Sequence, residues 1–188
     1  MKILLTGING QLGHYINQKL SSIYEVFALT HESFDLTNEI QMGKVIDDIK
    51  PDLIINPAAY TYVDNAEKES ELVFKTNYKA PEFLAIKTKK LGIPLIHFST
   101  DYIFDGLKRG AYFEDDKANP KSIYGKSKYD ADIIIQKNNA QHIIIRTSWV
   151  YSLRGKNFLT TILDMAKFKN SFSIVSDQIG APTSAFFI

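Results

Sequence analysis

The chain has 188 residues, of which 45% are hydrophobic and 23% are charged, and its formal net charge is +1. This composition is typical of globular proteins and excludes disordered and fibrous ones. The nearly neutral charge argues against nucleic acid as a partner, and the absence of cysteine excludes disulfides and cysteine-bound zinc. The apolar run at the N-terminus is too short for a signal peptide or a membrane span, so we expect a cytoplasmic protein without a membrane partner.

Short apolar, β-branched runs alternate with longer amphipathic segments along the chain. They predict strands at 2–5, 25–29, 52–56, 94–98, 142–146 and 172–175, and helices at 11–22, 39–50, 67–91, 122–138 and 157–169. Pro81 predicts a kink or a new start within the third helix. The runs hardly alternate in polarity, which indicates strands buried on both faces of a sheet. We therefore predict an α/β fold with a doubly wound parallel sheet.

The first predicted strand leads into TGINGQLG, with glycines at Gly7, Gly10 and Gly13, and then into a helix. Glycines at such a turn let the backbone approach a pyrophosphate at the N-terminus of the helix. A tight turn without a ligand is the alternative. Further along, Glu32 and Asp35 are candidates for the acid that binds the adenosine ribose, and no arginine is there to bind a 2′-phosphate. The choice between NADH and NADPH stays open.

Polar residues follow the fourth predicted strand in the stretch STDYIFDG, which begins at Ser99. In a parallel sheet, ligands bind at the carboxyl ends of the strands, so we expect Thr100 to face a ligand. Local turn caps are the alternative for Thr100 and Asp101. Tyr124 and Lys128 follow four residues apart, on one face of a predicted helix. We expect the ammonium to lower the pKa of the phenol, so that Tyr124 serves as a general acid or base.

Together with these residues, six stretches resemble the extended short-chain dehydrogenase/reductase superfamily, and within it the dTDP-4-dehydrorhamnose reductases. The stretches are TGINGQLG, PDLIINPAAYTYVDNAE, HFSTDYIFDG, YGKSK, RTSWVY and DQIGAPT. The resemblance implies a Rossmann-like NAD(P)-binding domain over residues 1–188. It also implies that residues from about 150 to 188 begin a C-terminal substrate domain that is only partly present, because family members are longer.

The resemblance assigns roles to individual residues. The predicted catalytic residues are Thr100, Tyr124 and Lys128. The predicted cofactor-binding residues are Gly7, Gly10, Gln11, Leu12, Gly13, Asp35, Leu36, Ala58, Ala59, Tyr60, Thr61, Tyr124 and Lys128. The predicted substrate-binding residues are Thr100, Asp101 and Trp149. For Trp149 the alternative is a half-buried tryptophan of the core.

The implied activity is the reduction of the 4-keto group of a nucleotide-linked deoxysugar by NADPH or NADH, with dTDP-4-dehydrorhamnose as the substrate. Two alternatives stay open: a non-catalytic, dinucleotide-binding regulatory subunit and a nucleotide-sugar epimerase. Dehydratases of the superfamily carry an acid where this chain has Tyr102, which disfavours elimination of water. We see no cluster of metal ligands, and a homodimer is left open.

Overall fold

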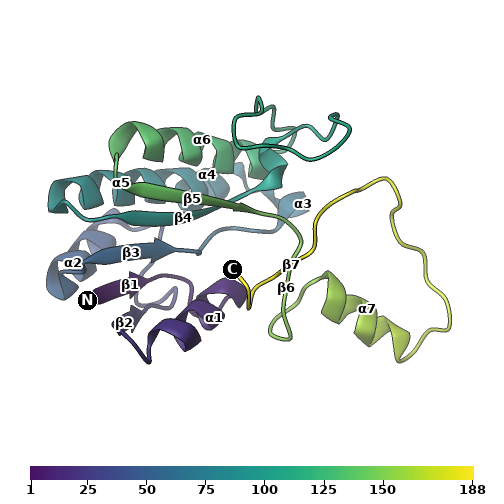
Figure 1. Ribbon diagram of the computed structural model, residues 1–188, viewed down its shortest axis with the longest axis horizontal. Coiled ribbons are helices and arrows are strands. Elements are labelled where there is room, and N and C mark those ends of the chain that lie inside the picture. Colours follow the sequence, from purple (N-terminus) through teal and green to yellow (C-terminus); the bar gives the residue numbers. More distant parts are fainter.

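The computed structural model describes residues 1–188 and contains a five-stranded sheet in the order β2-β1-β3-β4-β5 (Figure 1). Every neighbouring pair of these strands is parallel. The strands are β1 (Lys2–Leu5), β2 (Glu25–Ala28), β3 (Leu53–Asn56), β4 (Leu95–Thr100) and β5 (His142–Thr147). The first five predicted strands and the parallel sheet are thus confirmed.

Helices cover both faces of the sheet. On one face, α1 (Gln11–Leu20) packs through Leu12 and Ile16 on Ile3 and Leu5 of β1. The opposite face carries α2 (Glu39–Ile49), α5 (Ala80–Leu91) and α6 (Ile123–Asn138), which contribute apolar side chains to a core of 11 buried residues around Leu4. Along β1, Leu4 therefore belongs to the core on one face of the sheet, whereas Ile3 and Leu5 belong to the core on the other face. Because both faces are buried, the strands read as continuous apolar runs.

The order in which strands are added to the sheet reverses at β1. The connection through α1 places β2 on one side of β1, whereas the next connection places β3 on the other side. The segments after β1 and β3 therefore diverge to opposite faces, which leaves a crevice at the carboxyl edge of the sheet. The fold is thus doubly wound, as predicted.

Two predicted elements differ from the structure. The apolar run at 172–175 is exposed and forms no strand, because no strand lies beside it to complete the hydrogen bonds of its backbone. The helix predicted over 67–91 is interrupted. It consists of α4 (Ser70–Phe74), a π-helical turn η1 (Lys75–Lys79) and α5, and a short helix α3 (Val63–Ala66) precedes it. Pro81 lies in the first turn of α5, directly after this π-helical turn, so the regular helix is distorted where a kink or a new start was predicted.

Residues after β5 form a small region at one side of the sheet (Figure 1). It contains β6 (Val150–Tyr151), α7 (Phe158–Ala166) and β7 (Thr183–Ser184), and β6 pairs in parallel with β7. Asn157 caps α7, because its side chain accepts a hydrogen bond from the amide of Thr160 while the Thr160 hydroxyl accepts one from the amide of Asn157.

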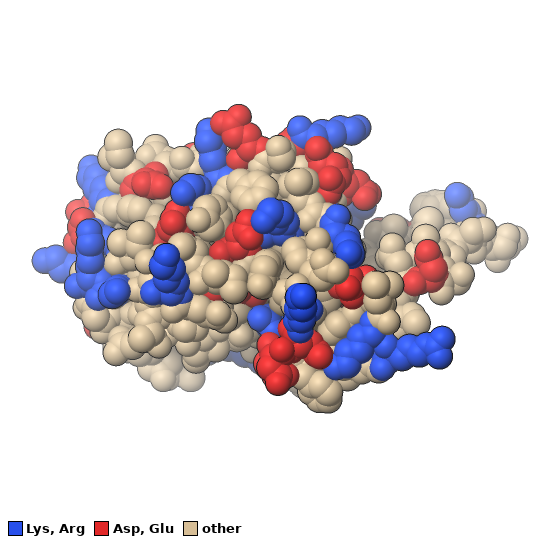
Figure 2. Space-filling model, turned by 90° about the horizontal axis from the view of Figure 1, so that it is seen from above, with Lys and Arg blue, Asp and Glu red and all other residues tan.

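Charged residues of both signs are mixed over the molecular surface. Figure 2 shows lysine and arginine beside aspartate and glutamate across one face, without a continuous basic stripe. Pairs of lysine with a nearby carboxylate fit this mixture, such as Lys75 with Glu71, Lys87 with Asp47 and Lys126 with Asp130. None of the helices has the length and apolarity that a membrane span requires.

The turn between β1 and α1 depends on two glycines. Gly7 has a φ of +62°, in the left-handed region that side chains rarely adopt. At Gly13 a Cβ atom would lie 2.1 Å from the carbonyl oxygen of Gly7, a separation that no packing tolerates. The absence of a side chain at Gly13 therefore lets α1 lie directly against the turn and holds its N-terminus at the crevice.

We predict that Gly13→Ala destabilises the chain, because α1 must move away from the backbone of the turn. The free energy of unfolding should fall by roughly 1–3 kcal/mol, which lowers the midpoint of thermal unfolding by about 2–4 °C for each kcal/mol. Gly43→Ala is the control, since it lies within α2 and its Cβ would meet only the ring of Phe83 at 3.5 Å. Thermal unfolding of both variants tests this packing, and equal midpoints would contradict it.

Candidate active site

A cavity of about 740 Å³ opens at the carboxyl edge of the sheet. Its walls come from the segments that follow all five strands of the main sheet, together with the start of α6. Of the two candidate acids for the adenosine ribose, Asp35 lines this cavity and Glu32 does not. All the residues to which the resemblance assigned a role line the cavity, although their roles remain predictions. They are Gly7, Gly10, Gln11, Leu12, Gly13, Asp35, Leu36, Ala58, Ala59, Tyr60, Thr61, Thr100, Asp101, Tyr124, Lys128 and Trp149.

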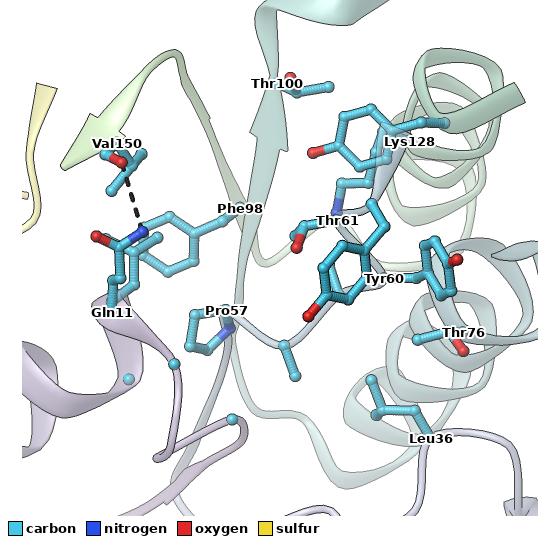
Figure 3. A pocket seen from close by; sticks show the side chains of 18 of the residues that line it. Gln11, Leu36, Pro57, Tyr60, Thr61, Thr76, Phe98, Thr100, Lys128 and Val150 are labelled. Carbon is cyan, nitrogen blue, oxygen red and sulfur yellow. Dashed lines mark hydrogen bonds between the residues drawn. The ribbon is translucent and has the colours of Figure 1, made fainter. Parts of the chain in front are cut away.

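The N-terminus of α1 forms one wall and is open to a ligand. Gly10 is its N-cap and provides no side-chain hydrogen bond, and the first turn of the helix contains no acid. Gln11 also connects this wall to the region after β5. Its Nε2 donates to the carbonyl of Val150 at 3.4 Å (Figure 3). Its Oε1 accepts from Ser152 Oγ at 2.8 Å and from Asn157 Nδ2 at 3.0 Å. Sequence reasoning did not anticipate this second role.

Residues 58–61 form the wall after β3, and Asn77 of the π-helical turn holds them. Asn77 Oδ1 accepts from the amide of Tyr60 at 2.8 Å, and its Nδ2 donates to the carbonyl of Tyr60 at 3.0 Å. The same Nδ2 donates to Ser127 Oγ at 3.2 Å, so the clamp also reaches α6. Asn77 is buried within a helical stretch, and nothing in the sequence pattern distinguishes it from an ordinary helical residue.

Thr100 and Asp101 lie at the end of β4, and the local turn considered as an alternative is present. Thr100 Oγ1 accepts from the amide of Tyr102 at 3.2 Å and donates to Asp101 Oδ1 at 3.2 Å. Both residues nevertheless line the cavity. Burial raises the pKa of the Asp101 carboxyl, and hydrogen bonds from Thr100 and from the backbone oppose this rise. Thr100 thus caps the local turn and also lines the cavity, so the two expectations do not exclude each other.

Tyr124 lies in the first turn of α6, and its phenol behaves differently from the expectation. Burial raises the pKa of Tyr124 to about 12, whereas the nearby hydroxyl of Thr100 opposes this rise and the negative charge of Asp101 adds to it. The ring packs edge-on against Tyr102, with the ring centres 5.6 Å apart. The expected lowering of the pKa of this phenol by Lys128 is therefore wrong for this state of the protein, and the phenol keeps its proton at neutral pH.

Lys128 is almost completely buried, with 2% of its surface exposed, and its Nζ atom meets a histidine. Lys128 Nζ lies 3.0 Å from His97 Nε2, on the sheet side of α6. Burial lowers the pKa of Lys128 to about 8, and the negative charge of Asp132 opposes this shift. Figure 3 shows Lys128 and Thr100 on the side of the cavity opposite Gln11 and Val150. Lysine and tyrosine thus share a wall of the cavity with Thr100.

Asp35 and Leu36 line the part of the cavity that follows β2, at the edge of the sheet away from β4 and β5. Asp35 Oδ1 accepts from the amide and from the hydroxyl of Thr37, both at 2.8 Å, and the amide of Thr37 is the main cause that lowers the pKa of this carboxyl. His31 Nε2 lies 3.8 Å from the same oxygen and is largely exposed. The carboxylate is thereby held in one orientation at the cavity.

Trp149 is partly exposed at the cavity, and its backbone is strained. Its φ is +46°, which is unusual for any residue other than glycine. Pairing with β7 holds it there, because the amide of Thr183 donates to its carbonyl at 3.2 Å. The indole packs against Phe158 of α7 at 5.5 Å between ring centres. Strained backbone of this kind is typical of functional sites.

Nowhere in the chain do three or more histidine, aspartate or glutamate side chains gather as ligands for a metal ion.

Known proteins are similar to this chain in sequence and in fold. The family described as the RmlD substrate binding domain matches residues 1–188. The dTDP-4-dehydrorhamnose reductase of Burkholderia thailandensis is 40% identical over 185 residues, which are 98% of this chain and 62% of that protein. The spore coat polysaccharide biosynthesis protein SpsK of Bacillus subtilis is 39% identical over 183 residues, which are 97% of this chain and 65% of that protein.

Solved structures agree with these relatives. The crystal structure of a dTDP-4-dehydrorhamnose reductase from Clostridium acetobutylicum superimposes with a TM-score of 0.95 at 37% identity, over 99% of this chain and 66% of that one. The Bacillus anthracis reductase in complex with NADP gives a TM-score of 0.94 at 36% identity, over 98% of this chain and 66% of that one. This chain therefore spans a little under two thirds of the length of the relatives that it matches. It belongs to the dTDP-4-dehydrorhamnose reductase family, matched as the RmlD substrate binding domain.

Proposed function

We propose that the chain binds a reduced nicotinamide dinucleotide in this cavity and takes part in reducing the 4-keto group of a nucleotide-linked deoxysugar such as dTDP-4-dehydrorhamnose. The observation that carries the proposal is the convergence of Thr100, Tyr124 and Lys128 on the cavity whose opposite wall is the glycine turn. The relatives named dTDP-4-dehydrorhamnose reductase, and the NADP complex of one of them, support the choice of reaction and cofactor.

The residues present fit a dinucleotide. The N-terminus of α1 offers amide groups and the positive end of the helix dipole, and neither an acid nor a capping side chain occupies them. A Cβ atom at Gly13 would push this helix away from the turn. Asp35 and Leu36 line the same cavity beyond the turn, where an adenosine would lie. The bound cofactor supplies a hydride, and the chain supplies placement and a proton.

Tyr124 is the proposed proton donor to the oxygen of the sugar carbonyl. A donor must carry its proton before the reaction, and a phenol with a pKa of about 12 does so throughout the physiological range. Thr100 Oγ1 lines the same cavity, and its hydrogen must turn from Asp101 Oδ1 toward the same oxygen to add a second donor. Donors aimed at an oxygen that gains negative charge stabilise the transition state more than the ground state. Lys128 is proposed to hold the nicotinamide ribose and to supply positive charge near Tyr124.

We predict that Gln11→Glu weakens dinucleotide binding about tenfold, because it places a negative charge beside the proposed pyrophosphate position; a tenfold change corresponds to about 1.4 kcal/mol. Trp149 is the single tryptophan of the chain and lines the cavity, so quenching of its fluorescence by NADH or NADPH measures binding. Gln18→Glu makes the same change at an exposed position of the same helix and should bind normally. Equal affinities of the two variants would argue against the pyrophosphate position.

We predict that Tyr124→Phe slows turnover by a factor of about 100 or more, the usual contribution of a positioned general acid. Binding of the dinucleotide should change less than about threefold, because the substitution removes only the hydroxyl group; a tenfold change would need about 1.4 kcal/mol. The measurement is steady-state oxidation of NADPH or NADH with a dTDP-4-dehydro sugar, followed by identification of the product. Unchanged turnover would remove Tyr124 from the mechanism. Binding without turnover by the unsubstituted chain would leave a dinucleotide-binding role alone.

The pH dependence of the reaction should have a single alkaline limb. Lys128 has a lowered pKa of about 8 and therefore loses its positive charge as the pH rises through that value. Tyr124 keeps its proton up to about pH 12, so it adds no second limb below pH 10. We predict that kcat/KM, which reports the ionisation of the free protein, is constant up to about pH 7, is halved near pH 8 and falls further above it. A profile that stays flat to pH 10 would contradict the role of the ammonium.

A further inference from the structure

A chain of buried hydrogen bonds lies beneath the cavity and connects its lysine to the strands of the sheet. Lys128 Nζ lies 3.0 Å from His97 Nε2, and His97 Nδ1 lies 3.2 Å from Asn56 Nδ2. Thr6 Oγ1 lies 2.6 Å from Asn56 Oδ1 and accepts from the amide of Ala58 at 3.3 Å. Neither His97 nor Asn56 lines the cavity, and both are almost completely buried.

The direction of these hydrogen bonds determines where the proton of His97 lies. Thr6 Oγ1 accepts from a backbone amide, and its own hydrogen goes to Asn56 Oδ1. The Nδ2 group of Asn56, which can only donate, therefore faces His97 Nδ1. Because a neutral imidazole carries one N–H, that hydrogen must be on Nε2, where it points at Lys128 Nζ. An ammonium has no lone pair to accept it, so this arrangement matches Lys128 as a neutral amine.

A protonated Lys128 requires the opposite direction. Its ammonium donates to His97 Nε2, which moves the ring hydrogen to Nδ1 and requires the oxygen of Asn56 there. Rotation of the Asn56 amide satisfies His97, but it turns Nδ2 toward Thr6 and deprives the Thr6 hydroxyl of its acceptor. The network thus has two discrete arrangements, one for each protonation state of Lys128. Each arrangement leaves the histidine neutral.

Other charged groups around Lys128 act on it unequally. Asp132 lies one turn further along α6, where its Oδ2 accepts from Ser99 Oγ at 2.9 Å and from Arg146 Nε of β5 at 3.4 Å. Burial raises the pKa of Asp132, and these two partners and Lys128 oppose that rise. On the cavity side the titratable neighbours are Tyr124 and Asp101. Only His97 meets Lys128 Nζ within hydrogen-bond distance, so it is the partner that must adapt.

Burial makes a charged histidine unfavourable at this position. The pKa of His97 lies well below the usual value, mainly because the ring is buried and also because Lys128 is close. The ring therefore responds to a proton on Lys128 by moving its own N–H, and it does not take up a charge. Moving an N–H from one nitrogen to the other allows a buried lysine to have a partner in both of its states.

We propose that His97 is a positioning residue that changes its tautomer when Lys128 gains or loses its proton, and that the Asn56 amide turns with it. The switch keeps Lys128 Nζ at one place at the cavity whether it is charged or neutral. Its consequence for catalysis rests on the function proposed above, because there Lys128 holds the ribose and supplies positive charge. The switch itself is a property of the protein without a ligand.

Nitrogen NMR of the imidazole rings tests this proposal, because protonated and unprotonated ring nitrogens have different shifts. The chain has four histidines, and His97→Gln identifies the signals of His97. Between pH 6 and pH 10 we expect the hydrogen of a neutral His97 to move from Nδ1 to Nε2, with a midpoint near the pKa of Lys128, about 8. His142 is the internal control, since its Nδ1 lies 2.5 Å from the carbonyl of Asn139, which fixes its tautomer when neutral.

Lys128→Met removes the partner that titrates and should abolish the change at His97 over the same pH range. One tautomer of His97 throughout the titration of the unsubstituted chain would overturn the proposal, as would a change that persists in Lys128→Met. The titration of the unsubstituted chain stands by itself if the variant does not fold. The measurement needs no turnover, so failure of the switch is distinguishable from failure of the reductase function, which the Tyr124 assay tests.

Discussion

The site depends on one constraint, which is that every strand of the main sheet points the same way. Parallel strands release the chain at a common edge, so segments that are far apart in sequence meet there. The glycine turn after β1, residues 58–61 after β3 and Thr100 at the end of β4 become neighbours for this reason. Helices on both faces must then cross back over the sheet, which buries the strands and leaves this edge for polar residues.

Burial shifts the pKa values of two residues of α6, Tyr124 and Lys128, in opposite directions. It favours the neutral form of each, which raises the pKa of Tyr124 and lowers that of Lys128. The phenol therefore retains its proton, while the amine, with a pKa of about 8, loses its positive charge at weakly alkaline pH. A protonated phenol and an amine of adjustable charge arise on one helix from one physical cause. The neutral His97 beneath the lysine completes this arrangement.

The strands and the cavity residues were predictable because they depend on local patterns. Apolar runs identified five strands, and the resemblance identified residues that all line one cavity. The strand at 172–175 was wrong, because an apolar run forms a strand only where another strand lies beside it. The clamp made by Asn77 and the bridge made by Gln11 could not be predicted, since each joins segments whose proximity the sequence pattern does not contain.

By itself the sequence determined the parallel sheet, the glycine turn and the pairing of Tyr124 with Lys128 on one helical face, because all three follow from periodicity and spacing. Only the tertiary structure decided what surrounds that pair. The pKa of an ionisable group depends on burial and on the atoms within hydrogen-bond distance, and neither can be read from spacing. His97 appeared as one residue of an apolar strand, and only the packing of α6 on β4 brought it to the lysine.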